Sequence, residues 1–123
     1  MRVFLDTSVL SHKSLNDLAV KVAERVSEGD EFLVSVLTHF ELLWGYRIAN
    51  LSSQRYEELI KTLGIEIVPL LEEDAMFAAE KKPGKTKLLD ALVASTVARY
   101  EAVLWTRDQD FDRFLPEEKI MIV

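Results

Sequence analysis

Short apolar runs of strand length alternate with segments of helical pattern along the whole chain. The predicted strands are residues 2–5, 32–36, 65–68, 102–105 and 119–123. The predicted helices are 17–28, 38–50, 54–63, 72–82 and 87–100, with a short helix or turn at 108–114. Apolar runs without polar alternation are typical of parallel strands covered on both faces. The alternation therefore predicts a Rossmann-like, three-layer α/β/α fold with a mostly parallel sheet of four to five strands.

Size and composition narrow the class of protein further. We expect residues 1–123 to form a single domain, because no linker-like segment divides them. The chain has no cysteine, which excludes disulfides and thiolate metal sites. It becomes acidic at Asp6, too early for a signal peptide, and its longest apolar stretch, 88–98, is too short to span a bilayer. We expect a cytoplasmic protein without a membrane partner.

Four acidic residues occupy related places in this pattern. Asp6 follows the first predicted strand, and Asp108 follows the strand at 102–105. Glu41 falls in the first turn of the helix after strand 32–36, and Asp90 falls in the first turn of helix 87–100. The carboxyl ends of parallel strands share one edge, where open α/β sheets place their ligand sites. We therefore expect the four carboxylates to face one crevice.

A cluster of carboxylates favours a hard divalent cation. Carboxylates that are brought together repel one another, and Mg²⁺ or Mn²⁺ relieves that repulsion through oxygen ligands. A bound ion with open positions can hold a phosphate oxygen and lower the pKa of a water molecule, which is the chemistry of phosphodiester hydrolysis. The net charge of −6 argues against a generic nucleic-acid binder, but a metal site would account for part of it.

Each acid taken singly also has a structural explanation. Asp6 can cap a helix, and Thr38-His39-Phe40-Glu41 matches a capping box in which Glu41 bonds back to the helix start. Asp90 suits the positive end of a helix dipole, and Asp108 suits a turn. The conjunction of all four at one edge is what favours a site.

Several other polar and aromatic residues also have ordinary structural explanations. His12 and His39 lack a third ligand for zinc, so we interpret them as ordinary side chains. Trp44 and Trp105 lie in apolar segments and are interpreted as core. The lysines around Pro83-Gly84 form either a solvated loop or a patch that contacts phosphate; they are Lys81, Lys82, Lys85 and Lys87.

At four places the chain resembles the PIN-domain family, and within it the VapC-like toxins of toxin–antitoxin pairs. The motifs are Val3-Phe4-Leu5-Asp6-Thr7-Ser8, Ser35-Val36-Leu37-Thr38-His39-Phe40-Glu41, Leu89-Asp90-Ala91-Leu92-Val93-Ala94 and Thr106-Arg107-Asp108-Gln109-Asp110-Phe111. They occur in the family's order and cover essentially the whole chain. The last motif departs from the family's usual T-x-N-x-x-D-F spacing, which leaves open whether Asp108 or Asp110 is the fourth carboxylate.

The resemblance implies a Mg²⁺- or Mn²⁺-dependent endoribonuclease that acts as a toxin. Its catalytic acids would be Asp6, Glu41, Asp90 and Asp108, with Asp6 and Asp90 as principal metal ligands. Supporting residues would be Thr7, Ser8, Thr106 and Asp110, and RNA contacts would come from Lys85, Lys87 and Arg107. The family also implies a homodimer and inhibition by a small antitoxin that fills the groove.

Two other functions compete with the nuclease. A non-catalytic binding module on a PIN-like fold would bind no divalent ion. A phosphoacceptor receiver-like domain needs paired acids after the first strand and an acceptor aspartate after a mid-chain strand, and this sequence has neither.

Overall fold

The computed structural model describes residues 1–123 and confirms the expected three-layer α/β architecture. Its strands are β1 (Arg2–Leu5), β2 (Glu31–Ser35), β3 (Glu66–Val68), β4 (Val103–Thr106) and β5 (Ile120–Ile122). Its α-helices are α1 (Thr7–Leu10), α2 (Leu15–Ser27), α3 (Val36–Ile48), α4 (Gln54–Thr62), α5 (Glu72–Glu80) and α6 (Leu88–Arg99). Three short 3-10 helices are η1 (Lys85–Lys87), η2 (Gln109–Arg113) and η3 (Glu117–Lys119). No helix combines the length and the apolar character that crossing a membrane would require.

The five strands form one sheet in the order β3-β2-β1-β4-β5, and every neighbouring pair is parallel. Phe4 of the central strand β1 pairs with Leu33 of β2 on one side and with Leu104 of β4 on the other. The chain first builds the sheet outward through β2 and β3 and then returns to the opposite side of β1. The strand order therefore reverses between β1 and β4, and their carboxyl ends flank the crevice in which such sheets bind ligands.

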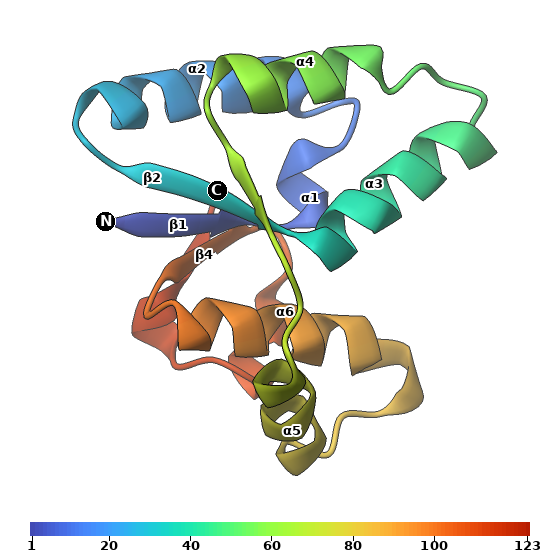
Figure 1. Cartoon of the computed structure of the whole chain (residues 1–123), viewed down its shortest axis with the longest axis vertical. Helices are drawn as coiled ribbons and strands as arrows, with labels where there is room; N and C mark the ends of the chain where they lie inside the picture. Colours follow the sequence, from blue (N-terminus) through green and yellow to red (C-terminus); the bar gives the residue numbers. More distant parts are fainter.

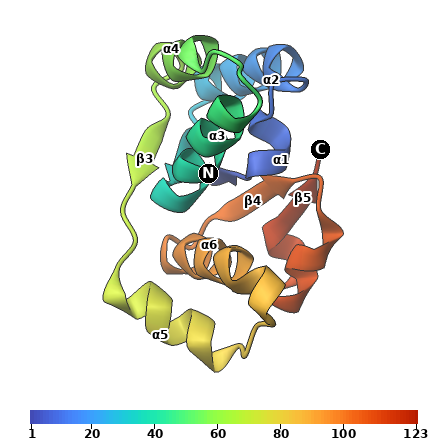
Figure 2. The same cartoon turned by 90° about the vertical axis from the view of Figure 1, so that its right-hand side faces the viewer.

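Helices cover both faces of the sheet (Figures 1 and 2). Side chains alternate along β1, so Val3 and Leu5 pack with α1 to α4, whereas Phe4 packs with α5 and α6. Val3, Phe4 and Leu5 are completely buried. This explains the uninterrupted apolar run, because each successive side chain enters one of the two cores.

Two helices end next to glycines with positive φ angles. Gly29 follows α2 and Gly64 follows α4, with φ angles of +97° and +66°. Glycine adopts this left-handed region without the steric penalty that a Cβ brings, so it ends helices readily. The predicted ends of both helices are confirmed.

The expected start of α3 is wrong. The helix begins at Val36 and not at Thr38, because Ser35 is its N-cap and the Ser35 hydroxyl accepts a hydrogen bond of 3.2 Å from the Leu37 amide. Thr38 is fully buried inside the helix, so the predicted capping box does not form. Glu41 consequently lies in the second turn and projects from the middle of the helix.

The two tryptophans have different environments. Trp105 is buried at 3% exposure, as predicted, and its ring meets Phe32 edge to face. Trp44 on α3 is 58% exposed, so its interpretation as a core residue is wrong. Ile48, one turn further along α3, is exposed as well, so this side of the helix faces outward.

A buried ion pair joins α5 to α6, the helix that carries Asp90. Asp74 is 1% exposed, and the Arg99 guanidinium donates to both of its oxygens at 2.9 and 3.0 Å. Burial by itself would raise the pKa of Asp74, but hydrogen bonds from Arg99, the Leu71 amide and Thr96 outweigh it and lower the pKa. Because this bidentate pair satisfies a buried charge, it fixes the placement of α6 against α5.

Candidate active site

Asp6 stands at the carboxyl end of β1 and is mostly buried, with 8% exposure. It is the N-cap of α1, as its sequence context allows. All hydrogen bonds to the Asp6 carboxylate are accepted by the same oxygen, Oδ2. The donors are the Ser8 hydroxyl at 2.8 Å, the Thr106 hydroxyl at 2.8 Å and the Ser8 amide at 3.4 Å. Oδ1 has no hydrogen bond from the protein. The carboxylate is therefore held rigidly by one oxygen and offers the other.

Two hydroxyls tie the end of β1 to the segment after β4. The Thr106 hydroxyl donates to Asp6 and accepts from the Asp108 amide at 3.0 Å. The Ser8 hydroxyl likewise donates to Asp6 and accepts from the Arg107 amide at 2.9 Å. Because both hydroxyls are fully engaged, the position of Asp108 relative to Asp6 is set by hydrogen bonds as well as by the sheet.

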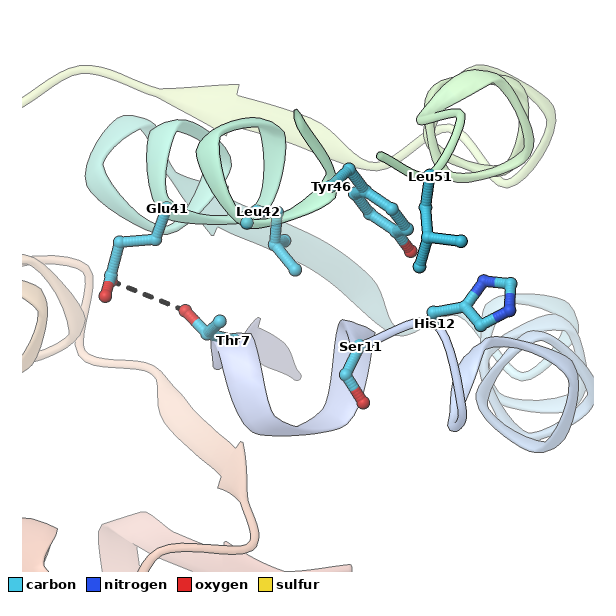
Figure 3. A pocket seen from close by; sticks show the side chains of 8 residues that line it. Thr7, Ser11, His12, Glu41, Leu42, Tyr46 and Leu51 are labelled. Carbon is cyan, nitrogen blue, oxygen red and sulfur yellow. Dashed lines mark hydrogen bonds between the residues drawn. The ribbon is translucent and has the colours of Figure 1, made fainter. Parts of the chain in front are cut away.

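Glu41 projects from α3 toward this edge. Its Oε1 accepts a hydrogen bond of 3.4 Å from the Thr7 hydroxyl at the start of α1 (Figure 3). Partial burial raises the pKa of Glu41, and the negative charges of Asp6 and Asp90 raise it further, against the lowering effect of Thr7. The shift shows that Glu41, Asp6 and Asp90 share one electrostatic environment although they are far apart in sequence.

Asp90 lies in the first turn of α6, as predicted. Burial raises its pKa most, and the charges of Asp6 and Asp108 add to that effect, whereas Lys87 lowers it. Lys87 Nζ lies 3.7 Å from Asp90 Oδ2. The sequence leaves Lys87 either in a solvated loop or in contact with phosphate, yet its ammonium lies among the acids.

Asp108 and Asp110 lie two positions apart and differ in their contacts. Asp108 is the N-cap of η2, and its Oδ1 accepts a hydrogen bond of 2.8 Å from the Asp110 amide. Asp110 is the more exposed of the two, at 60% against 38%, and its carboxylate contacts Lys87 at 3.0 Å. Only Asp108 is linked to Asp6, through Thr106, so the geometry favours Asp108 as the acid that belongs with Asp6.

The donor set fits a hard divalent cation in its chemistry. All candidate ligands are carboxylate oxygens, and burial together with mutual repulsion raises the pKa of both Glu41 and Asp90. No three of these carboxyl groups stand close enough together to enclose an ion on their own. Mg²⁺ usually takes only one or two carboxylates and keeps several water molecules, which would span the remaining gaps.

A pocket of about 230 Å³ opens beside Glu41, between α3 and the start of the chain's first helices. Figure 3 shows Tyr46, Leu51 and His12 around its far end. Tyr46 is 5% exposed, and its hydroxyl has no hydrogen-bond partner. Sequence reasoning missed these residues as a group, since they come from three separate segments and share no motif.

The PIN-domain family model matches residues 3–114. The chain belongs to the PIN-domain family. This membership leaves the receiver-like alternative without support, and in the structure neither β2 nor β3 ends in an aspartate. No curated protein matches the sequence.

Solved structures of similar fold come from toxin–antitoxin complexes. VapBC2 from Rickettsia felis, bound to a promoter DNA fragment, matches this PIN domain with a TM-score of 0.72 and 17% identity, covering 98% of both chains. A toxin–antitoxin complex from Klebsiella pneumoniae matches with a TM-score of 0.66 and 22% identity over 98% of this chain and 96% of the other. VapBC-1 from nontypeable Haemophilus influenzae matches with a TM-score of 0.66 and 20% identity, covering 98% of this chain and 97% of the other. At these identities the likeness establishes the shared fold.

The raised pKa of Glu41 predicts a gain in stability when its charge is removed. A carboxyl group with a higher pKa in the folded state binds more protons there, so stability falls as pH rises through the window above its ordinary pKa of 4.5. In the absence of divalent ions, Glu41→Gln should raise the melting temperature at pH 7 by a few degrees. The gain should shrink as the pH is lowered toward 4.5, which thermal melts at several pH values would measure.

Glu24→Gln is the matched control, because Glu24 is exposed on α2 and its side chain has no hydrogen bond or ion pair. It should leave the melting temperature nearly unchanged. A Glu41→Gln variant that melts below the parent at pH 7 would contradict the electrostatic interpretation of this site.

Proposed function

We propose that this PIN domain is a Mg²⁺- or Mn²⁺-dependent endoribonuclease. The proposal rests on Asp6, a buried carboxylate with one free oxygen at the switch point of the sheet. Asp6 lies beside Glu41 and Asp90, and its charge adds to the effect of burial in raising their pKa values. Buried charge without a partner is unfavourable, so such a group is retained where a ligand completes it. A divalent ion is the ligand that suits oxygen donors.

The residues of the site would have different roles. Asp6 and Asp90 would be the principal metal ligands, and Glu41 and Asp108 would complete the site through water molecules. A bound ion would lower the pKa of a water molecule and offset negative charge on the phosphate. Ser8 and Thr106 orient Asp6, and Thr7 orients Glu41. Lys85 and Arg107, both exposed, would contact the RNA backbone.

We further propose that the nuclease is the toxin of a toxin–antitoxin pair. The solved structures that share the fold over nearly the full length are of such pairs. The pocket beside Glu41 supports the proposal, because its exposed lining is apolar and would accept an apolar side chain of a small antitoxin. An inhibitor seated there would lie directly against Glu41.

An exposed apolar stripe on α3 supports a homodimer. The stripe consists of Val36, Phe40, Trp44 and Ile48, at intervals of four residues along one side of the helix, and all four are exposed. Two of them are aromatic, the residue class that most often anchors interfaces. A stripe on one helix is self-complementary across a twofold axis, so a second copy of this chain is a fitting partner.

Removal of either principal ligand should abolish catalysis without unfolding the protein. Asp6→Asn and Asp90→Asn should each lower the rate of Mn²⁺-dependent RNA cleavage by at least ~100-fold, since the metal supplies several kcal/mol of transition-state stabilisation. Asp112→Asn is the control, because Asp112 is exposed on η2 and has no hydrogen bond or ion pair. The cleavage of a labelled RNA, with circular dichroism as the check on folding, measures the effect.

Cleavage by Asp6→Asn and Asp90→Asn at the parental rate would refute the site. If the parent cleaves no RNA and binds no Mn²⁺ at millimolar concentration, the protein is a non-catalytic binding module on this fold.

A charge in the middle of the α3 stripe should separate the dimer. Trp44→Glu should convert a dimeric parent to a monomer, because the interface would then bury an unpaired carboxylate. Val20→Glu is the control, since Val20 is equally exposed but lies on α2. Sedimentation velocity measures the change. A parent that is monomeric, or a Trp44→Glu variant that remains dimeric, would rule out this interface.

The antitoxin proposal predicts that a small protein is encoded immediately upstream. We expect it to copurify with this chain and to suppress RNA cleavage. Gly45→Leu should weaken that complex, because Gly45 lines the pocket and a side chain there would fill it. A Cβ added at Gly45 meets no atom within 4 Å, so the helix backbone accepts the substitution. A housekeeping role in RNA processing is indicated if no such neighbour binds or inhibits.

A further inference from the structure

Lys87 occupies an unusual place for a lysine on a polar loop. Its ammonium lies 3.0 Å from Asp110 Oδ2, 3.7 Å from Asp90 Oδ2 and 4.0 Å from Asp108 Oδ2. Its side chain is only 23% exposed. Lysine ordinarily keeps its ammonium in water, so a single ammonium shared by three carboxylates from η2 and α6 indicates a defined position.

The position of Lys87 divides the acidic edge into two halves. On one half, Asp6 and Glu41 receive hydrogen bonds from hydroxyl and amide groups and have no cation within ion-pair distance. On the other half, Asp108 and Asp110 face the ammonium. Asp90 lies between them and contacts Lys87 at the longer distance of 3.7 Å. One half thus contains its own positive charge, and the other half lacks one.

An ammonium in this place competes with a second divalent ion. Two-metal nuclease sites hold their ions roughly 3.5–4 Å apart, and the carboxylate between them is shared by both. A second ion bound to Asp108 or Asp110 would have to displace Lys87 from the same oxygens, or remain close to its charge. Like charges at such short separation repel each other, which disfavours holding both.

The geometry points to Lys87 as a built-in substitute for the second metal ion. This inference rests on the proposed metal-dependent function: one divalent ion binds on the half formed by Asp6, Glu41 and Asp90, and Lys87 neutralises the half formed by Asp108 and Asp110. Lys87 is then a positioning residue that sets the number of ions, and not in the first place a contact for RNA.

The number of Mn²⁺ ions bound by the full chain, without RNA, tests this role. Electron paramagnetic resonance of free Mn²⁺ during a titration should give one ion per parental chain and two per chain for Lys87→Met. Lys87→Arg keeps the charge and should bind one. Lys85→Met removes an exposed charge from the same 3-10 helix and should also bind one. In the Lys87→Met background, Asp108→Asn with Asp110→Asn should return the count to one.

Two ions on the parent, none on the parent, or one on a folded Lys87→Met variant would each overturn the inference. The last result, together with weaker RNA binding, would assign Lys87 to the phosphate backbone. If Lys87→Met does not fold without ions, its melting temperature in Mn²⁺ and the Lys87→Arg count decide the matter. Failure of the proposed function shows instead as absence of RNA cleavage, which the ion count does not measure.

Discussion

The parallel pairing of β1 with both β2 and β4 is the constraint on which the rest of the site depends. Because β1 is central and the strand order reverses beside it, the carboxyl ends of β1 and β4 lie side by side. Asp6 and Thr106 therefore meet although they are a hundred positions apart in the sequence. The Asp6 amide extends the pairing with a 3.1 Å hydrogen bond to the Trp105 carbonyl. The Ser8 and Thr106 hydroxyls then lock the two strand ends together. The position of Asp6 is therefore determined by backbone pairing, which side-chain substitutions elsewhere change little.

Glu41 and Asp90 depend on a second level of structure, the starts of two helices. Ser35 fixes where α3 begins, so it determines that Glu41 points toward Thr7. Asp90 is placed by α6, which the buried Asp74–Arg99 pair holds against α5. In their present places both carboxyl groups have raised pKa values and oppose folding at neutral pH. Retaining unfavourable charges on an otherwise well-packed scaffold is typical of a site selected for function over stability.

The sequence predicted the edge of the sheet well and the details of the helices less well. Strand ends could be located because apolar runs stop at Asp6 and shortly before Asp108. The carboxyl ends of parallel strands share one edge of the sheet, which brings these acids to the same side. The start of α3 was misplaced because Ser35 and Thr38 are both good caps, and only the three-dimensional path chooses between them. Trp44 was misjudged because an apolar pattern shows which residues share a helix face, not whether that face meets the core. Two of the acids that contact Lys87, Asp108 and Asp110, lie 21 and 23 positions further along the chain, so no local sequence pattern reveals these contacts.

The acidic character of the chain and its proposed substrate can be reconciled through the same edge. Five carboxylates and a single ammonium leave this edge strongly negative, so it repels the phosphates of RNA until a cation is present. Since the ammonium of Lys87 is engaged by Asp108, Asp110 and Asp90, it offsets its neighbours and adds little attraction for a polyanion. The ion held by Asp6 and Asp90 would therefore have two roles, one in chemistry and one in making the crevice accessible to phosphate. Ion binding would then precede RNA binding, an order that follows from the charge of the site before any step of hydrolysis is considered.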